Sequence, residues 1–285
     1  MLIHSPANPI NTGTGTIGVF DSGYGGLTVL KEIVRRLPQY DYIYLGDNSR
    51  APYGNRSFET VYHYTLQCVQ WLFDQGCPLV ILACNTASAK ALRTIQQNDL
   101  PKIDSAKRVL GVIRPTSEII GQYTKNNKVG ILATKGTVQS QSYVIEINKF
   151  FPSVHVEQEA CPMWVPLVEN KEHEGHGADY FIRKNVGELL KKNRNIDTIL
   201  LACTHYPLLK KKIEEYVPVD VTILSQGEIV ANSLADYLER HPEIEQQLGQ
   251  FAHRRFYTTD DTVDFDSQAE TFFGEPVSSV HVDLL

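Results

Sequence analysis

Long apolar segments are absent from this chain of 285 residues, and so is an excess of positive charge. Nowhere do 18 apolar residues run together, and residues 1–16 carry neither a basic region nor an apolar core, so we expect no membrane span and no secretory leader. With 33 acidic against 27 basic side chains, the formal net charge is −6. Binding nucleic acid or an anionic membrane usually requires concentrated Lys and Arg, so both partners are disfavoured.

Paired cysteines are missing as well. The five cysteines stand singly at Cys68, Cys77, Cys84, Cys161 and Cys203. An odd number of scattered cysteines does not make a disulfide framework, and structural zinc sites use closer C-x₂₋₄-C pairs. We therefore expect a soluble, cytoplasmic protein with reduced thiols and no metal site.

From residue 16 onward, short apolar runs alternate with amphipathic stretches, which is typical of parallel sheets with crossover helices. The strands are expected at 17–20, 42–45, 80–83, 109–112, 129–133, 154–157, 198–201 and 221–223. The helices are expected at 26–36, 58–75, 86–98, 139–149, 180–192, 207–216 and from 226 through 240, with a mixed tail after it. Residues 1–15 are polar and aperiodic, so we expect a flexible N-terminal arm there.

Two nearly identical phrases occur far apart in the chain. They read ILACNT at 81–86 and LLACTH at 200–205. An apolar strand with a small polar turn opens the series before each phrase, at Gly18 and at Gly130. This repetition predicts a duplicated α/β lobe.

The cysteines of the two phrases, Cys84 and Cys203, each end an apolar strand and precede a helix. Ligands of α/β sheets bind at such positions, and helix N-termini favour thiolates. A cysteine after an apolar run is ordinarily a small core residue, but hydrogen-bonding residues follow both of these. If the lobes face each other, two thiols confront one cleft. That arrangement suits racemisation, in which a base on one face removes a proton and an acid on the other face returns one.

Several motifs, in order, resemble those of glutamate racemases, within the cofactor-independent aspartate/glutamate racemase superfamily. They are DSGYGGL at 21–27, GD at 46–47 with APYG at 51–54, ACNTA at 83–87, ATKGT at 133–137 and ACTHYP at 202–207. The resemblance implies reversible interconversion of L- and D-glutamate without cofactor, which supplies D-glutamate for peptidoglycan, and commonly a homodimer. It also implies two pseudo-symmetric flavodoxin-like lobes with the site in the cleft between them. Residues 16–113 plus 225–285 would form the first lobe and 114–224 the second.

The resemblance also implies roles at the matching positions. Cys84 would be the base that acts on D-glutamate, and Cys203 its counterpart for the L enantiomer. Asp21 would be the acidic neighbour of the first thiol, and His205 with Glu169 would assist the second. The residues implied to hold the substrate, largely by hydrogen bonds and ion pairs, are Asp21, Ser22, Asp47, Tyr53, Gly54, Asn85, Thr86, Thr137, Thr204 and His205.

Other interpretations remain open at single positions and for the whole chain. Asp21 and Thr86 can each be helix caps, and Glu169 lies in a polar stretch typical of the surface. The remaining three cysteines are expected in the core or on the surface. Residues 114–117 depart from the family pattern close to the lobe junction. As a whole, the chain can instead be a racemase or isomerase of the same superfamily acting on aspartate or another small acid, or a bilobed anion-binding module without turnover.

Overall fold

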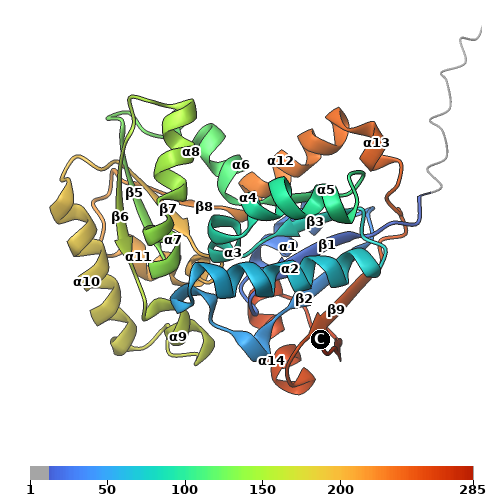
Figure 1. Ribbon diagram of the computed structural model, residues 1–285. Coiled ribbons are helices and arrows are strands. Elements are labelled where there is room, and N and C mark those ends of the chain that lie inside the picture. Colours follow the sequence, from blue (N-terminus) through green and yellow to red (C-terminus); the bar gives the residue numbers. More distant parts are fainter. Residues whose placement is uncertain (1–12, 285) are drawn as a thin grey trace, which may run out of the picture.

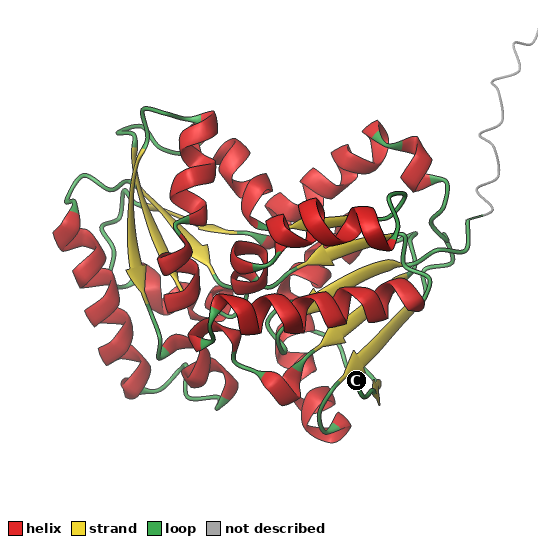
Figure 2. Cartoon of the chain, viewed as in Figure 1, coloured by secondary structure: helices red, strands yellow, loops and turns green. Residues whose placement is uncertain are grey.

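Two parallel β-sheets, each at the centre of one lobe, organise the computed structural model (Figure 1). The structure describes residues 13–284, so the first twelve residues of the expected arm lie outside it. The first lobe contains a six-stranded sheet in the order β10-β9-β2-β1-β3-β4, and the second lobe a four-stranded sheet in the order β6-β5-β7-β8. Helices cover the sheets in both lobes (Figure 2).

The strands of the first lobe are β1 (Ile17–Asp21), β2 (Tyr42–Gly46), β3 (Leu79–Leu82), β4 (Arg108–Gly111), β9 (Arg254–Thr258) and β10 (Ser279–His281). Those of the second lobe are β5 (Lys128–Ala133), β6 (His155–Ala160), β7 (Thr198–Ala202) and β8 (Thr222–Ser225). The α-helices are α1 (Leu27–Arg36), α2 (Phe58–Asp74), α3 (Asn85–Lys90), α4 (Leu92–Thr94), α5 (Leu100–Ile103), α6 (Ile113–Ile119), α7 (Lys135–Ser140), α8 (Ser142–Phe150), α9 (Trp164–Glu169), α10 (His176–Lys192), α11 (Lys210–Glu214), α12 (Gly227–Arg240), α13 (Pro242–Glu245) and α14 (Thr262–Phe273).

The two sheets share one strand order. In chain order within each lobe, β2-β1-β3-β4 and β6-β5-β7-β8 are both second, first, third, fourth, which is the flavodoxin-like arrangement. Each of the two repeated phrases ends a third strand, β3 or β7. The predicted fold class, two related α/β lobes with parallel sheets, is therefore confirmed.

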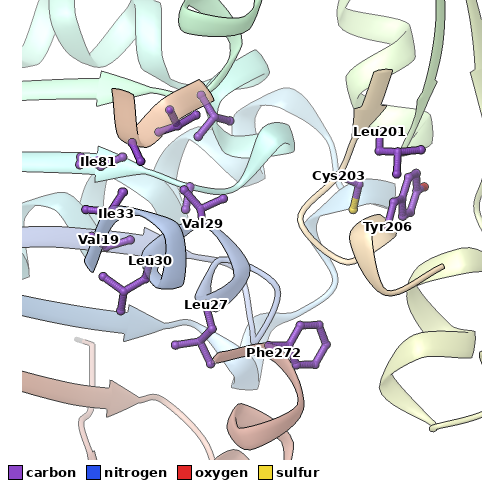
Figure 3. Packing of buried hydrophobic residues seen from close by; sticks show 14 of the residues in the cluster. Val19, Leu27, Val29, Leu30, Ile33, Ile81, Leu201, Cys203, Tyr206 and Phe272 are labelled. Carbon is purple, nitrogen blue, oxygen red and sulfur yellow. The ribbon is translucent and has the colours of Figure 1, made fainter. Parts of the chain in front are cut away.

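The hydrophobic core accounts for the continuous apolar sequences of the central strands and for the contact between the lobes. β1, β2, β3 and β7 are buried along their whole length, because a parallel sheet is covered on both faces. Helix α1 packs Leu27 and Leu30 near Val19 of β1 (Figure 3). The same hydrophobic cluster continues to Leu201 and Tyr206 of the second lobe. The lobes thus meet through a shared apolar contact beside the cleft.

Three expected helices are interrupted in the structure. The segment 86–98 divides into α3, α4 and a π-helical turn over Ile95–Asp99. The segment 139–149 divides at Gln141, whose φ of 56° is left-handed and separates α7 from α8. The segment 207–216 begins as a 3₁₀ turn over Tyr206–Leu209. Amphipathic periodicity alone does not reveal such breaks, because the apolar spacing continues through them.

The tail after residue 240 completes the first sheet. β9 pairs with β2, and β10 pairs with β9, with α14 between them. The apolar pattern of the sequence did not predict these strands, because Arg254 and Arg255 of β9 are exposed. Gly15, at the end of the expected arm, is held by backbone hydrogen bonds to Gln247 and Gly249. Within residues 13–284, no helix is long and apolar enough to cross a membrane.

The chain crosses between the lobes twice. It leaves the first sheet after β4 through α6, and it returns after β8 into α12. Helix α12 packs against α1 of the first lobe and also contacts α6. Both crossings therefore lie side by side at the junction.

Candidate active site

A cavity of ≈ 60 Å³ lies between the lobes, where the carboxyl ends of their strands meet. From the first lobe it is lined by Ser22, Ala51, Pro52, Tyr53, Gly54, Asn55, Cys84, Asn85 and Thr86. From the second lobe it is lined by Thr134, Lys135, Cys161, Pro162, Val165, Pro166, Glu169, Cys203, Thr204 and His205. A larger cavity of ≈ 690 Å³ lies elsewhere at the junction, but it contains none of the predicted site residues. The structure thus brings the two thiols of the repeated phrases to one space.

The first thiol, Cys84, is the N-cap residue of α3. Its Sγ accepts a hydrogen bond from the backbone N–H of Ala87 at 3.4 Å and lies 3.5 Å from Oγ of Ser22. Thr86 is therefore not the cap of this helix. Burial, followed by the negative charge of Asp21, raises the pKa of Cys84 to about 12. At neutral pH Cys84 is a neutral thiol, which is the form of a proton donor.

Asp21 lies buried at the end of β1 without itself lining the cavity. Its Oδ2 accepts a hydrogen bond from the N–H of Gly23 at 3.0 Å, and it does not cap α1. Burial raises the pKa of Asp21, against the charge of His205. Among the described residues Oδ1 of Asp21 has no hydrogen-bond partner. Buried oxygens of this kind are normally satisfied, so Asp21 is suited to receive a cationic ligand group.

The second thiol, Cys203, belongs to a chain of three groups. Nδ1 of His205 lies 4.0 Å from Sγ of Cys203, and Nε2 of the same ring lies 3.0 Å from Oε1 of Glu169. Burial acts to lower the pKa of His205, but its contacts with Cys203 and Glu169 outweigh burial and raise the pKa to about 10. At neutral pH an imidazolium therefore stands beside Cys203. A cation in this place stabilises a thiolate.

Three contacts tie the lobes together around the cavity. Oγ1 of Thr28 donates to the carbonyl of Thr204 at 2.9 Å, and the hydroxyls of Thr86 and Thr134 lie 3.0 Å apart. The amide of Gln268 donates to the carbonyl of Glu169 at 3.0 Å. The two lobes are thus held together beside the two thiols.

Besides Asp21, two more of the residues implied to contact the substrate, Asp47 and Thr137, do not line the cavity. Asp47 is fully buried and is held by Nε of Arg50 at 2.7 Å and Oγ1 of Thr259 at 2.9 Å. The hydroxyl of Tyr53, a residue that lines the cavity, also donates to Asp47. Thr137 is buried behind Thr134, with the two hydroxyls 3.1 Å apart.

Other predicted residues lie at the cavity as expected from the motifs. Ser22, Tyr53, Gly54, Asn85, Thr86, Thr204, His205 and Glu169 all line it together with the two cysteines. The side-chain amide of Asn85, however, already bonds to Tyr143 and Gln226. These two bonds use its Oδ1 and one N–H of its amide.

Sequence reasoning missed Thr134 and Cys161, which also line the cavity. Cys161 follows β6 directly, in the same relation to its strand as the other two cysteines, and that position was the available signal. Cys68 and Cys77 are buried in the core, as expected. Within residues 13–284, no group of three or more His, Cys, Asp or Glu side chains is placed to hold a metal ion.

Comparison with known proteins identifies the family. Residues 17–234 match the model of the Asp/Glu/Hydantoin racemase family. A glutamate racemase from Dinoroseobacter shibae is 41% identical over 279 residues, which cover 94% of this chain and 99% of that protein. The crystal structure of a glutamate racemase isoform from Bacillus anthracis superposes with a TM-score of 0.86 at 36% identity, covering 95% of this chain and 98% of that one. The Francisella tularensis glutamate racemase, solved in complex with D-glutamate, has a TM-score of 0.84 at 31% identity, with 95% and 98% coverage. On the extent of the family match and the identity to these relatives, the chain belongs to the Asp/Glu/Hydantoin racemase family.

Proposed function

We propose that this protein interconverts L- and D-glutamate with two thiols and no cofactor. The observation that carries the proposal is that Cys84 and Cys203, one from each lobe, line a single cavity in unequal surroundings, with Asp21 near the first and His205 beside the second. The similarity to several glutamate racemases, one of them solved with D-glutamate, supports the choice of substrate.

In the direction from L to D, the thiolate of Cys203 removes the proton from Cα. The C–H bond breaks, its electron pair stays on the substrate, and an S–H bond forms on Cys203. The thiol of Cys84 then gives its proton to the opposite face of Cα and becomes a thiolate. The D to L direction runs these steps in reverse, with Cys84 as the base.

The surrounding groups suit an amino acid with two carboxylates. Asp21 does not line the cavity, but its negative charge beside Cys84 favours an ammonium group at that end of the site. The hydroxyls of Thr86 and Thr134, and Lys135 exposed beside them, can bind carboxylates. A charged carbanion-like state is stabilised best where such groups are already oriented, and the lining of the cavity brings them together.

We also propose that the lobes comprise residues 16–113 plus 225–285 and residues 114–224. Because each supplies one thiol, neither lobe is active alone. A homodimer, a cytoplasmic location and a role in supplying D-glutamate for peptidoglycan complete the proposal, from the resemblance described above. Sedimentation of the purified protein tests the dimer.

The substrate is tested by incubating the reduced protein with L-glutamate or L-aspartate and separating the enantiomers by chiral chromatography. We expect D-glutamate to form until both enantiomers are equal, and far less turnover of aspartate. Faster turnover of aspartate overturns the assignment in favour of a sister activity. Glutamate binding without turnover, unchanged after both thiols are alkylated, identifies a binding module instead.

A further inference from the structure

A buried polar network joins the two lobes directly behind Cys84. The hydroxyl of Tyr143 donates to Oδ1 of Asn85 at 2.5 Å, and Nδ2 of Asn85 donates to Oε1 of Gln226 at 2.7 Å. Nε2 of Gln226 in turn lies 2.6 Å from the Tyr143 hydroxyl and 3.1 Å from both Oγ1 of Thr116 and the carbonyl of Val112. We call these five residues the junction network.

The members of the junction network come from four separate segments. Asn85 begins α3 of the first lobe, and Tyr143 lies on α8 of the second lobe. Val112 and Thr116 lie on the first crossing between the lobes, and Gln226 lies on the second crossing, between β8 and α12. The network therefore fixes both crossings and both lobes to one another at a single point.

The network is neutral, buried and closed. Its side chains are amides and hydroxyls, and all of its members are buried. Deleting one partner of a buried hydrogen bond leaves the other unsatisfied, which is costly in a buried site. Connected buried polar groups therefore define one arrangement rather than several.

Cys84 is the residue directly before Asn85, and its sulfur caps the helix that Asn85 begins. A displacement of the Asn85 side chain is therefore transmitted to Sγ of Cys84 through one peptide unit. Proton transfer between a thiol and Cα requires close and specific approach, and a misplacement of about 1 Å can reduce a rate about 10²-fold. The position of Cys84 relative to the second lobe is thus sensitive to Tyr143 and Gln226.

We propose that Tyr143 and Gln226 are positioning residues, which hold Asn85 and thereby place the Cys84 sulfur opposite the second-lobe thiol. This inference rests on the proposed two-thiol racemisation. Residues 114–117, which depart from the family pattern, also have a role in this proposal. Oγ1 of Thr116 is one of the acceptors for Nε2 of Gln226. Within this network the Asn85 side chain uses its Oδ1 and one N–H of its amide.

The test compares Tyr143→Phe and Gln226→Met with Tyr42→Phe. Tyr42 is an equally buried tyrosine whose hydroxyl donates to the carbonyl of Leu37 at 2.7 Å, outside the network. We expect kcat to fall about 10- to 100-fold in the two network variants, with KM changed less than about threefold. Tyr42→Phe should keep the kcat of the unmodified protein.

Isotope effects separate positioning from a general structural defect. With glutamate deuterated at Cα, Cys84 removes the deuteron from the D enantiomer and Cys203 removes it from the L enantiomer. Slowing the Cys84 step makes abstraction from D-glutamate more rate-limiting and abstraction from L-glutamate less so. In Tyr143→Phe the primary isotope effect on kcat/KM should therefore rise for D-glutamate and fall for L-glutamate.

Equal losses in Tyr143→Phe and Tyr42→Phe, a rise in KM at unchanged kcat, or isotope effects that change alike for both enantiomers each overturn the proposal. If the two network variants fail to fold, Thr116→Val, which removes only one contact of Gln226, provides the same comparison with smaller effects. If the unmodified protein does not racemise glutamate, the proposed function fails. The positioning claim is then decided by whether Tyr143→Phe alters the alkylation rate of Cys84 relative to Cys203.

Discussion

Oε1 of Glu169 lies 3.0 Å from Nε2 of His205, and this contact leaves the other ring nitrogen, Nδ1, facing Sγ of Cys203 at 4.0 Å. The carboxylate helps to keep the imidazole charged, so the second-lobe thiol has a cation beside it. The first-lobe thiol, Cys84, has the acidic Asp21 near it instead. Two cysteines with almost the same sequence context are therefore chemically unequal.

Replacing Glu169 by Gln should slow racemisation about tenfold or more, because the imidazolium beside Cys203 loses its partner. Glu169 raises the pKa of His205, so its removal lowers that pKa. The alkaline decline of kcat/KM, expected as pH rises toward about 10, should move to lower pH in the variant. A pH profile measures the shift. Glu174→Gln, at an exposed position on the same connection, is the control, and an unmoved alkaline limb in Glu169→Gln contradicts the assignment.

Alkylation should distinguish the two thiols in the free protein. Both are almost equally buried and line the same cavity, so access is matched. Burial and Asp21 raise the pKa of Cys84 to about 12, whereas Cys203 has an imidazolium beside it. We expect iodoacetamide to modify Cys203 first at neutral pH, as followed by peptide mass spectrometry. Asp21→Asn should narrow the difference, and preferential labelling of Cys84 is the contrary result.

At Gly25 the first lobe approaches the second closely. A Cβ atom there would collide with the side chains of Thr204 and His205. We therefore expect Gly25→Ala to displace His205 and to reduce kcat/KM about 10²-fold. Gly187→Ala on α10 is the matched control, because nothing lies near its added methyl group. It should keep full activity and gain ~0.5–1 kcal/mol in stability. Full activity in Gly25→Ala contradicts the closed arrangement of the lobes.

Asp47 should matter for stability more than for catalysis. It is fully buried and paired with Arg50, so Asp47→Asn leaves a partly buried cation without its anion. We expect a loss of about 3 kcal/mol in the free energy of unfolding, measured with urea. Asp236→Asn, at an exposed position of α12, should change stability little. If Asp47→Asn unfolds like the unmodified protein but loses substrate affinity, Asp47 contacts the substrate after all.

Local sequence patterns were sufficient for the parts of the fold that depend on burial. The continuous apolar runs of β1, β3 and β7 are visible in the sequence because both faces of these strands are covered. The polar residues at the ends of these strands predicted the wall of the cavity, because ligands of α/β sheets bind at such positions. Asp21 and Asp47 look alike in the sequence, since Asp21 ends β1 and Asp47 follows β2. Only the fold shows that Arg50 and Thr259 occupy Asp47.

Local sequence patterns could not predict the orientation of the Asn85 side-chain amide. Its partners Tyr143 and Gln226 lie 58 and 141 residues away along the chain. No local periodicity encodes a contact of that length. The chemistry of the motif predicted a polar residue at the cavity, while the long-range packing decided which way its amide points.

The central claim is that each thiol serves its own face of Cα. It is tested most directly by racemising L-glutamate with the reduced protein in deuterated water and measuring the label in both enantiomers at low conversion. The account predicts that each D-glutamate carries one deuterium at Cα, because Cys84 delivers a solvent-derived proton, while the remaining L-glutamate is largely unlabelled. D-glutamate that retains the original hydrogen would show that one group moves the proton across both faces, which contradicts the two-thiol account.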